Sequence, residues 1–202
     1  MKKEVVLIFQ KNEVLGKVKT RLAAGMGEHR ALEIYRYLIR LTYSALETVQ
    51  VPVWTYFSDF IPQTVNVPVD RSFVQQGQDL GERMANAFAR TFESGMNKGV
   101  LIGTDCPTLQ PQHLVQAFDA LTNSDLVLGP ATDGGYYLIG MKHLHSNLFE
   151  GITWSTSTVL AETLKRAKIA GLSVYLLPQL DDVDTAADWE KYVAKHPEVG
   201  YL

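Results

Sequence analysis

Short apolar runs alternate with longer segments of helical periodicity along this chain of 202 residues, and this alternation most constrains its fold. The run 5–9 is apolar at every position and rich in β-branched residues, which is typical of a strand covered on both faces in a mostly parallel sheet. From 31 to 46, apolar residues recur at three- and four-residue spacing, which predicts a crossover helix. We therefore expect one α/β domain over 1–202, with 5–9 as its central strand.

The remaining elements follow from the same patterns. Further strands are predicted at 51–57, 100–103, 126–128, 136–141 and 173–177, with a short one at 73–74 in an otherwise irregular stretch 62–78, and further helices at 80–94, 111–121, 157–170 and 185–195. Strand 136–141 has no crossover helix before it, which predicts that it either pairs antiparallel or sits elsewhere in the sheet, so we expect a mixed sheet. Because parallel strands place their carboxyl ends at one edge, we expect ligands to bind there.

Charge and cysteine content exclude several classes of protein. The chain has 22 acidic and 19 basic residues, a formal net charge of -3, so it lacks the general positive charge of proteins that coat nucleic acid or anionic membrane. Its one cysteine, Cys106, excludes an internal disulfide and a thiol zinc site. The apolar run 5–9 is far shorter than the roughly 20 residues that span a bilayer. These features predict a cytoplasmic protein without a membrane span.

Positive charge is concentrated directly after the first strand. Glycine lets the backbone approach an anion, and lysine and arginine offer charge-assisted hydrogen bonds to phosphate. The segment is not a Walker A loop, because Lys11 and Val18 replace residues that this motif requires. The predicted phosphate-binding residues are Gly16, Lys17, Lys19, Thr20 and Arg21, with Lys19 as a catalytic group, and a solvated surface loop remains the alternative.

Carboxylates follow two other strands at the same predicted edge. Asp105 comes directly after the run 100–103, and the segment 181–184 holds three aspartates after the run 173–177. Mg²⁺ binds through one or two carboxylates plus substrate phosphates, so Asp105 and Asp184 form a candidate metal site. A turn role for Asp105, and helix capping by Asp184 or Thr185, remain open.

Two further loops are candidates for the acceptor side. Asp133, Gly134 and Gly135 form a predicted turn, which is a plain hairpin or a substrate loop with Asp133 as a general base. Trp154, Ser155 and Thr156 offer an aromatic surface and hydroxyls that suit a sugar ring, and capping of the next helix by Ser155 or Thr156 is the alternative.

Five stretches together resemble one family. They are Gly16-Lys17-Val18-Lys19-Thr20-Arg21-Leu22, Gly77-x-Asp79-Leu80-Gly81-Glu82-Arg83-Met84, Gly103-Thr104-Asp105-Cys106-Pro107, the segment 129–140 and Asp182-Val183-Asp184-Thr185. In this order they resemble a bacterial family of glycosyltransferase-A-like proteins in the nucleotide-diphospho-sugar transferase superfamily, related to molybdenum-cofactor and phospholactate guanylyltransferase-like proteins. The resemblance implies a Rossmann-like three-layer domain, a phosphate loop with Lys17, Lys19 and Arg21, and Mg²⁺ or Mn²⁺ at Asp105 and Asp184.

The resemblance also implies an activity. We expect a metal-dependent transferase that takes a nucleotide-sugar or nucleoside triphosphate donor and an unidentified small-molecule acceptor, with glycosyl transfer favoured over nucleotidyl transfer. No nucleic acid or membrane partner is expected. A nucleotide-binding module without catalysis is the alternative.

Overall fold

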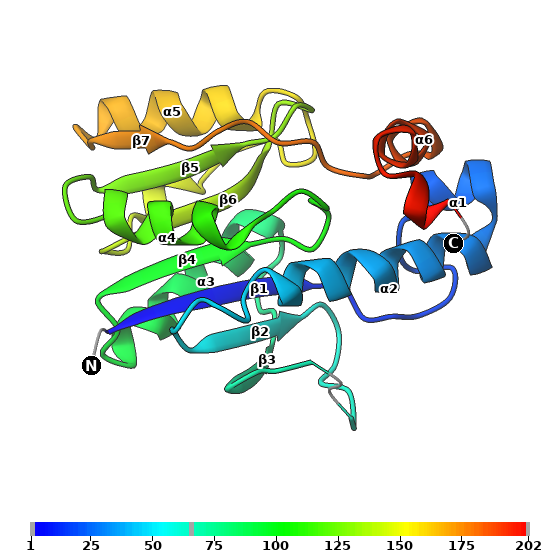
Figure 1. The fold of residues 1–202 in the computed structure, drawn as a ribbon. Coiled ribbons are helices and arrows are strands. Elements are labelled where there is room, and N and C mark those ends of the chain that lie inside the picture. The colour runs from blue at the N-terminus through cyan, green and yellow to red at the C-terminus, as the bar shows by residue number, and fades with distance from the viewer. Residues whose placement is uncertain (1–2, 65–66, 201–202) are drawn as a thin grey trace.

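The computed structural model describes residues 3–64 and 67–200, and their strands form one sheet (Figure 1). The strands are β1 (Glu4–Gln10), β2 (Val53–Phe57), β3 (Arg71–Val74), β4 (Lys98–Ile102), β5 (Leu126–Pro130), β6 (Tyr136–Met141) and β7 (Val174–Leu176), in the order β3-β2-β1-β4-β6-β5-β7. β6 pairs antiparallel with β4 and β5, and the other pairs are parallel. The predicted mixed, mostly parallel sheet is confirmed, with β1 between β2 and β4.

Helices cover both faces of this sheet. They are α1 (Thr20–Met26), α2 (Glu28–Ser44), α3 (Leu80–Glu93), α4 (Pro111–Ala120), α5 (Val159–Ile169) and α6 (Ala186–Lys195), with short 3₁₀ turns at Ser146–Leu148 and Pro197–Val199. Alternate residues of β1 serve two cores: Val6 and Ile8 belong to the core under α2 and α4, and Val5 and Leu7 to the core under α3 and α5. The predicted three-layer α/β arrangement is thereby confirmed.

A third apolar cluster lies beyond the edge of the sheet. There α6 packs against α1 and α2, with Leu22, Ile34 and Trp189 fully buried between them (Figure 1). The backbone of α1 approaches α6 closely, because a Cβ on Gly25 would lie 2.8 Å from the Cβ of Ala186. The sequence patterns did not predict α1, which lies in a segment expected to be a loop.

The residues at the N-termini of the helices show which of the predicted capping roles are correct. The side chain of Asp79 accepts a hydrogen bond from the backbone N–H of Glu82 and caps α3. Thr185 caps α6 in a capping box with Asp188, so Asp184 is not the cap. The residue before α5 is Thr158, and no side chain caps this helix, so neither Ser155 nor Thr156 has the capping role.

The strand order reverses between β1 and β4, and this reversal positions the site. β2 and β3 extend the sheet on one side of β1, while β4 begins the other side. In open α/β sheets such a switch point leaves a crevice beyond the carboxyl ends of the strands.

Among the described residues, no helix combines the length and apolar character needed to cross a membrane. Residues 65–66 of the predicted irregular stretch lie outside the described part.

Candidate functional site

A cavity of about 470 Å³ lies at the switch point. Its walls come from the loops after β1 and β4, from α3, from β6 and from the segment before α6. The charged side chains that line it are Lys11, Lys19, Arg21, Arg83, Asp105, Asp182 and Asp184. Cations from the first loop therefore meet carboxylates from segments far along the chain.

The ammonium group of Lys19 is the centre of this arrangement. Its Nζ lies 2.6 Å from Oδ1 of Asp105, 2.9 Å from Oδ1 of Asp184 and 2.6 Å from the backbone oxygen of Val183. The Lys19 side chain is 5% exposed, whereas that of Asp105 is 44% exposed. Arg21 pairs with the other oxygen of Asp184 at 2.8 Å but is itself 70% exposed. Lys19 is thus enclosed, while Arg21 and Asp105 face the solvent-accessible part of the cavity.

The segment 178–184 reaches this site because it continues along the end of β5. Leu180 donates its N–H to the backbone oxygen of Pro130 at 3.1 Å and accepts from Thr132 at 3.0 Å. Further on, the N–H of Val183 donates to the backbone oxygen of Asp105 at 2.9 Å. These backbone bonds join the ends of β4 and β5, so Asp105 and Asp184 approach the same point.

Lys19, Asp105 and Asp184 form an ion cage, and its electrostatics favour the charged forms of Lys19 and Asp184. Burial alone would lower the pKa of Lys19, but the carboxylates of Asp105 and Asp184 outweigh it and raise that pKa above its ordinary value. Burial alone would raise the pKa of Asp184, but Lys19 and Arg21 outweigh it and lower that pKa. Lys19 and Asp184 are therefore both charged at neutral pH.

Asp182 differs from its neighbours because one of its oxygens is buried without a partner. Its Oδ1 has no hydrogen bond within the part of the chain that the structure describes. Burial, followed by the nearby charge of Asp105, raises the pKa of Asp182 to about 8. Buried polar atoms almost always have a hydrogen-bond partner. A buried carboxyl oxygen without one therefore indicates a place where a bound group would supply the partner.

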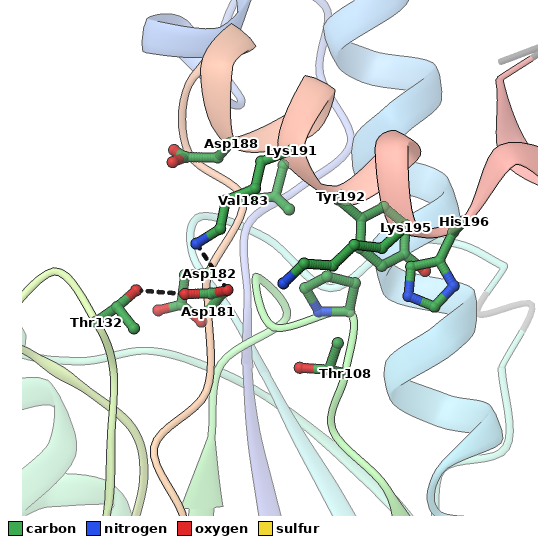
Figure 2. Close-up of a pocket in the computed structure, with 11 residues that line it drawn as sticks. Thr108, Thr132, Asp181, Asp182, Val183, Asp188, Lys191, Tyr192, Lys195 and His196 are labelled. Atoms are coloured by element: carbon green, nitrogen blue, oxygen red, sulfur yellow. Dashed lines mark hydrogen bonds and ion pairs between the residues drawn. The ribbon is translucent and has the colours of Figure 1, made fainter.

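Asp182 also separates the main cavity from a smaller one of about 60 Å³. Figure 2 shows Lys191 and Lys195 extending from α6 on one side of the smaller cavity, with Thr132 and Asp181 on the other. Asp181 accepts hydrogen bonds from Thr132 at 2.8 Å and from Lys191 at 2.9 Å. These two bonds attach the turn after β5 to α6.

Tyr35 is a site residue that the sequence analysis missed. It was placed only on the apolar face of a helix, yet its hydroxyl accepts hydrogen bonds from the N–H of Lys11 at 2.9 Å and from the Thr104 hydroxyl at 3.2 Å. The loops after β1 and β4 are thereby held together. A buried tyrosine requires a partner for its hydroxyl, and this requirement was the signal available in the sequence.

The predicted phosphate residues are divided between the cavity and the surface. Lys19, Thr20 and Arg21 line the cavity, whereas the exposed Lys17 does not. Gly16 has a φ of 74° in the turn before them, a conformation that favours glycine. The loop therefore presents its second half, rather than its first, to the cavity.

The predicted turn at 131–135 is built by backbone interactions. Oδ1 of Asp133 accepts a hydrogen bond from the N–H of Gly135 at 2.8 Å, and Asp133 is exposed and does not line the cavity. Gly134 has a φ of 92°, and a Cβ there would lie 2.1 Å from the backbone oxygen of Ser157. Only glycine fits this contact. Neither Gly134 nor Gly135 lines the cavity.

One residue of the predicted acceptor loop at 154–156 lines the cavity. The ring of Trp154 packs against Gly81 of α3, where a Cβ would lie 2.7 Å from it. The Thr156 hydroxyl donates to the backbone oxygen of Thr153 at 2.7 Å. Ser155 lines the cavity and has a φ of 63°. Among the described non-glycine residues only Ser155 and Lys19 have positive φ, and both lie on the cavity.

The match to a family model decides the family. Residues 56–156 match the model described as an uncharacterized protein conserved in bacteria, DUF2064. The chain belongs to the DUF2064 family. A solved structure from Desulfovibrio desulfuricans G20, provisionally assigned as a nucleotide-diphospho-sugar transferase, is 31% identical over 100% of this chain and 90% of that chain, with a TM-score of 0.89. No functionally curated protein matches the sequence.

More distant structures share the fold of this DUF2064 member. CMP:2-keto-3-deoxy-manno-octonic acid synthetase complexed with CTP is 14% identical over 98% of this chain and 99% of that chain, with a TM-score of 0.60. An inositol-1-phosphate CTP transferase from T. maritima is 14% identical over 96% of this chain and 94% of that chain, with a TM-score of 0.57. The predicted superfamily and fold class are confirmed, and the D. desulfuricans and T. maritima proteins carry transferase names, as predicted for this chain.

Proposed function

We propose that this protein is a transferase whose donor carries a nucleotide diphosphate or triphosphate, bound in the switch-point cavity together with Mg²⁺ or Mn²⁺. One observation carries the proposal: Lys19 and Arg21 meet Asp105 and Asp184 at this cavity. Its volume of about 470 Å³ falls within the roughly 300–1,000 Å³ typical of small-molecule sites. The CTP bound by one fold relative, and the CTP transferase name of another, support a nucleotide donor.

The donor set fits a hard cation that arrives with phosphate. Among the described residues, no three His, Cys, Asp or Glu side chains gather closely enough to hold a metal by themselves. Two carboxylates, Asp105 and Asp184, do face a common point. Mg²⁺ is held in many sites by one or two carboxylates plus substrate phosphates, and it would supply charge neutralisation there.

In this proposal the chain acts by positioning and charge neutralisation. Arg21 and Lys19 donate hydrogen bonds to the donor's phosphate oxygens and offset the charge that develops on the leaving phosphate. Tyr35 keeps the phosphate loop fixed against Thr104. Asp133 is the proposed base for the acceptor, in which case the acceptor extends from the cavity to the exposed turn at 131–135.

Glycosyl transfer and nucleotidyl transfer remain two candidate reactions. The resemblance of the five motifs supports a nucleotide-dependent transferase without choosing between them, and glycosyl transfer is the reaction we propose. Nucleotidyl transfer is favoured by the two CTP-linked fold relatives. The released product separates them, because glycosyl transfer releases a nucleotide and nucleotidyl transfer releases pyrophosphate. Slow Mn²⁺-dependent hydrolysis of the donor without an acceptor would also contradict a non-catalytic binding module.

Thermal-shift titration with nucleotides and nucleotide sugars, with and without Mn²⁺, tests donor binding. A ligand at 100 times its dissociation constant adds about 2.7 kcal/mol of stability. We expect Asp105→Ala and Asp184→Ala to abolish the Mn²⁺-dependent part of this shift while remaining folded. Asp119→Asn, an exposed carboxylate on α4, is the control. Unchanged Mn²⁺-dependent affinity in both variants would contradict the site.

Arg21→Ala tests phosphate recognition separately. A hydrogen bond to a charged group contributes about 1.5–3 kcal/mol, so the affinity for a diphosphate-bearing ligand should fall by that amount while the free nucleoside is unaffected. Arg30→Ala, an exposed arginine on α2, should change neither affinity. Equal losses for nucleoside and nucleotide would show that Arg21 does not recognise phosphate.

A further inference from the structure

We propose that the ammonium group of Lys19 serves as an internal cation that occupies the metal position, so that a divalent cation binds only after the donor's phosphates draw Lys19 away. This inference rests on the proposed function for the identity of the donor. Its central test measures binding of the metal alone, so the outcome does not depend on which donor the protein binds.

The contacts of Lys19 match the needs of an ammonium ion completely. An ammonium group has three N–H donors, and Lys19 has three acceptors within 2.9 Å: the oxygens of Asp105, Asp184 and Val183. Two of these are the carboxylate oxygens proposed as cation ligands. Neither Oδ1 can bind a divalent cation in the same direction while Lys19 holds it, because two positive charges would share one oxygen and repel each other.

The charge around the cage supports such an exchange. Without Lys19, the carboxylates of Asp105 and Asp184 would retain Arg21 and Lys11 as nearby cations, and Arg21 contacts the far oxygen of Asp184 from solvent. The buried Oδ1 of Asp182 remains without a hydrogen-bond partner even with Lys19 in place. An unpartnered polar atom that Lys19 does not use is thus also present at this site.

The backbone of Lys19 shows that its position is imposed by the surroundings. Its φ of 48° and ψ of 46° place it in the left-handed region, which lysine rarely adopts. Its backbone oxygen accepts from the N–H of Ala23 at 2.8 Å and begins α1. Phosphate oxygens would offer the flexible side chain new acceptors from this same backbone position. We infer that donor and divalent cation bind with positive coupling.

The test measures Mn²⁺ binding without nucleotide, by the EPR signal of free Mn²⁺. Wild type should bind weakly, and Lys19→Met should bind more tightly by about 5- to 150-fold, the usual range for coupling between two ligands. Lys165→Met, which removes an exposed lysine on α5, should bind as wild type does. The double variant Lys19→Met/Asp184→Asn should lose the gain.

Thermal unfolding of the same proteins supplies a second measurement. Because Lys19→Met leaves carboxylates facing one another, its melting temperature should be low without metal and should rise with Mn²⁺ more than that of wild type. If Lys19→Met binds Mn²⁺ no more tightly than wild type, or if the double variant keeps the gain, the inference is wrong.

The wild-type protein provides a test that does not depend on a variant folding. The buried ammonium of Lys19, with all three N–H groups hydrogen-bonded, should give a protected ¹H–¹⁵N signal in NMR spectra. This signal should persist with Mg²⁺ alone and should change with Mg²⁺ plus CTP. A change with Mg²⁺ alone, at the same concentration, would overturn the exchange, whereas no response to CTP by any method would instead contradict the proposed donor.

Discussion

The loop at 11–21 and the turn at 131–135 lie at the same edge of the sheet, yet their polar residues serve different purposes. In the loop, Lys19 and Arg21 leave their own segment and bind carboxylates from elsewhere in the chain. In the turn, the carboxylate of Asp133 binds the N–H of Gly135, two residues away. The cationic side chains of the loop thus connect distant segments, whereas the carboxylate of Asp133 bonds within its own turn.

Glycine also serves different ends in the two regions. Gly16 gives the loop a turn before its cationic residues, and a Cβ there would approach the flexible side chain of Glu28 at 3.1 Å. Gly134 faces rigid backbone at 2.1 Å. A side chain can move aside and a packed backbone cannot, so the turn should tolerate substitution much less well than the loop.

The largest expected effect is that of Gly134→Ala. A left-handed non-glycine residue costs about 1–3 kcal/mol and overpacking costs a further 1–3 kcal/mol, so the free energy of unfolding should fall by roughly 3 kcal/mol or more. Urea unfolding measures it. Gly135→Ala is the control, since its φ is not positive and its nearest contact is Asp133 at 3.2 Å. Equal losses would show that the backbone contact with Ser157 is unimportant.

Tyr35→Phe tests how the loop is held. Removing the hydroxyl leaves the partly buried N–H of Lys11 without its acceptor, which should cost at most about 1–3 kcal/mol. Urea unfolding again measures the change, and hydrogen exchange at Lys11 should accelerate. Tyr175→Phe, at an exposed tyrosine that contacts Gln116, should cost less. Unchanged exchange at Lys11 would show that other contacts fix the loop.

Ser155→Gly should stabilise the protein, unlike the other substitutions. Relief of the left-handed strain stabilises the fold by about 1–3 kcal/mol. The greater conformational freedom of glycine in the unfolded chain offsets about 0.4–1 kcal/mol of this, so the free energy of unfolding should rise by about 1 kcal/mol. Ser155→Ala keeps the strain and should not stabilise. If both variants have the same stability in urea, the positive φ of Ser155 carries no strain.

Asp181→Asn should produce the smallest effect, confined to acid pH. Hydrogen bonds from Lys191 and Thr132 lower the pKa of Asp181 from its ordinary value of 3.8. A lowered carboxyl pKa stabilises the fold above the unfolded value, and this contribution is lost as pH falls through the folded value. At most about 1 kcal/mol is expected for an exposed pair. Thermal unfolding across acid pH should therefore be flatter in Asp181→Asn, and an identical pH dependence would contradict the bonds.

The sequence predicted the sheet well because its signal is local. Runs such as 5–9 and 136–141 carry their own strand composition, and the missing crossover before β6 revealed its antiparallel direction. It did not predict α1, because this short helix contains Gly25 and depends on packing against α6. The apolar partners that stabilise it are supplied by a distant part of the chain.

The position of the candidate site could be predicted from the sequence, but the contacts between its residues could not. Charge after the first strand and carboxylates after two others pointed to one edge of the sheet, and the cavity lies there. The bond from Lys19 to Asp184 spans 165 positions and has no local signal. Conversely, Gly134 and Trp154 belong to the loops predicted to bind the acceptor. In the structure, Gly134 packs against the backbone of Ser157, and Trp154 packs against α3.

The bond between Lys19 and Asp184 has a consequence for biosynthesis. A nascent chain that has been translated only as far as residue 180 already contains β1 to β7, with Lys19 and Asp105, but it lacks Asp184 and α6. Contacts so distant along a chain form late, because a large loop must close before they are gained. Ribosome-bound chains of this length should therefore hold the sheet without the ion cage, and competence to bind a donor should arise only when α6 emerges and docks.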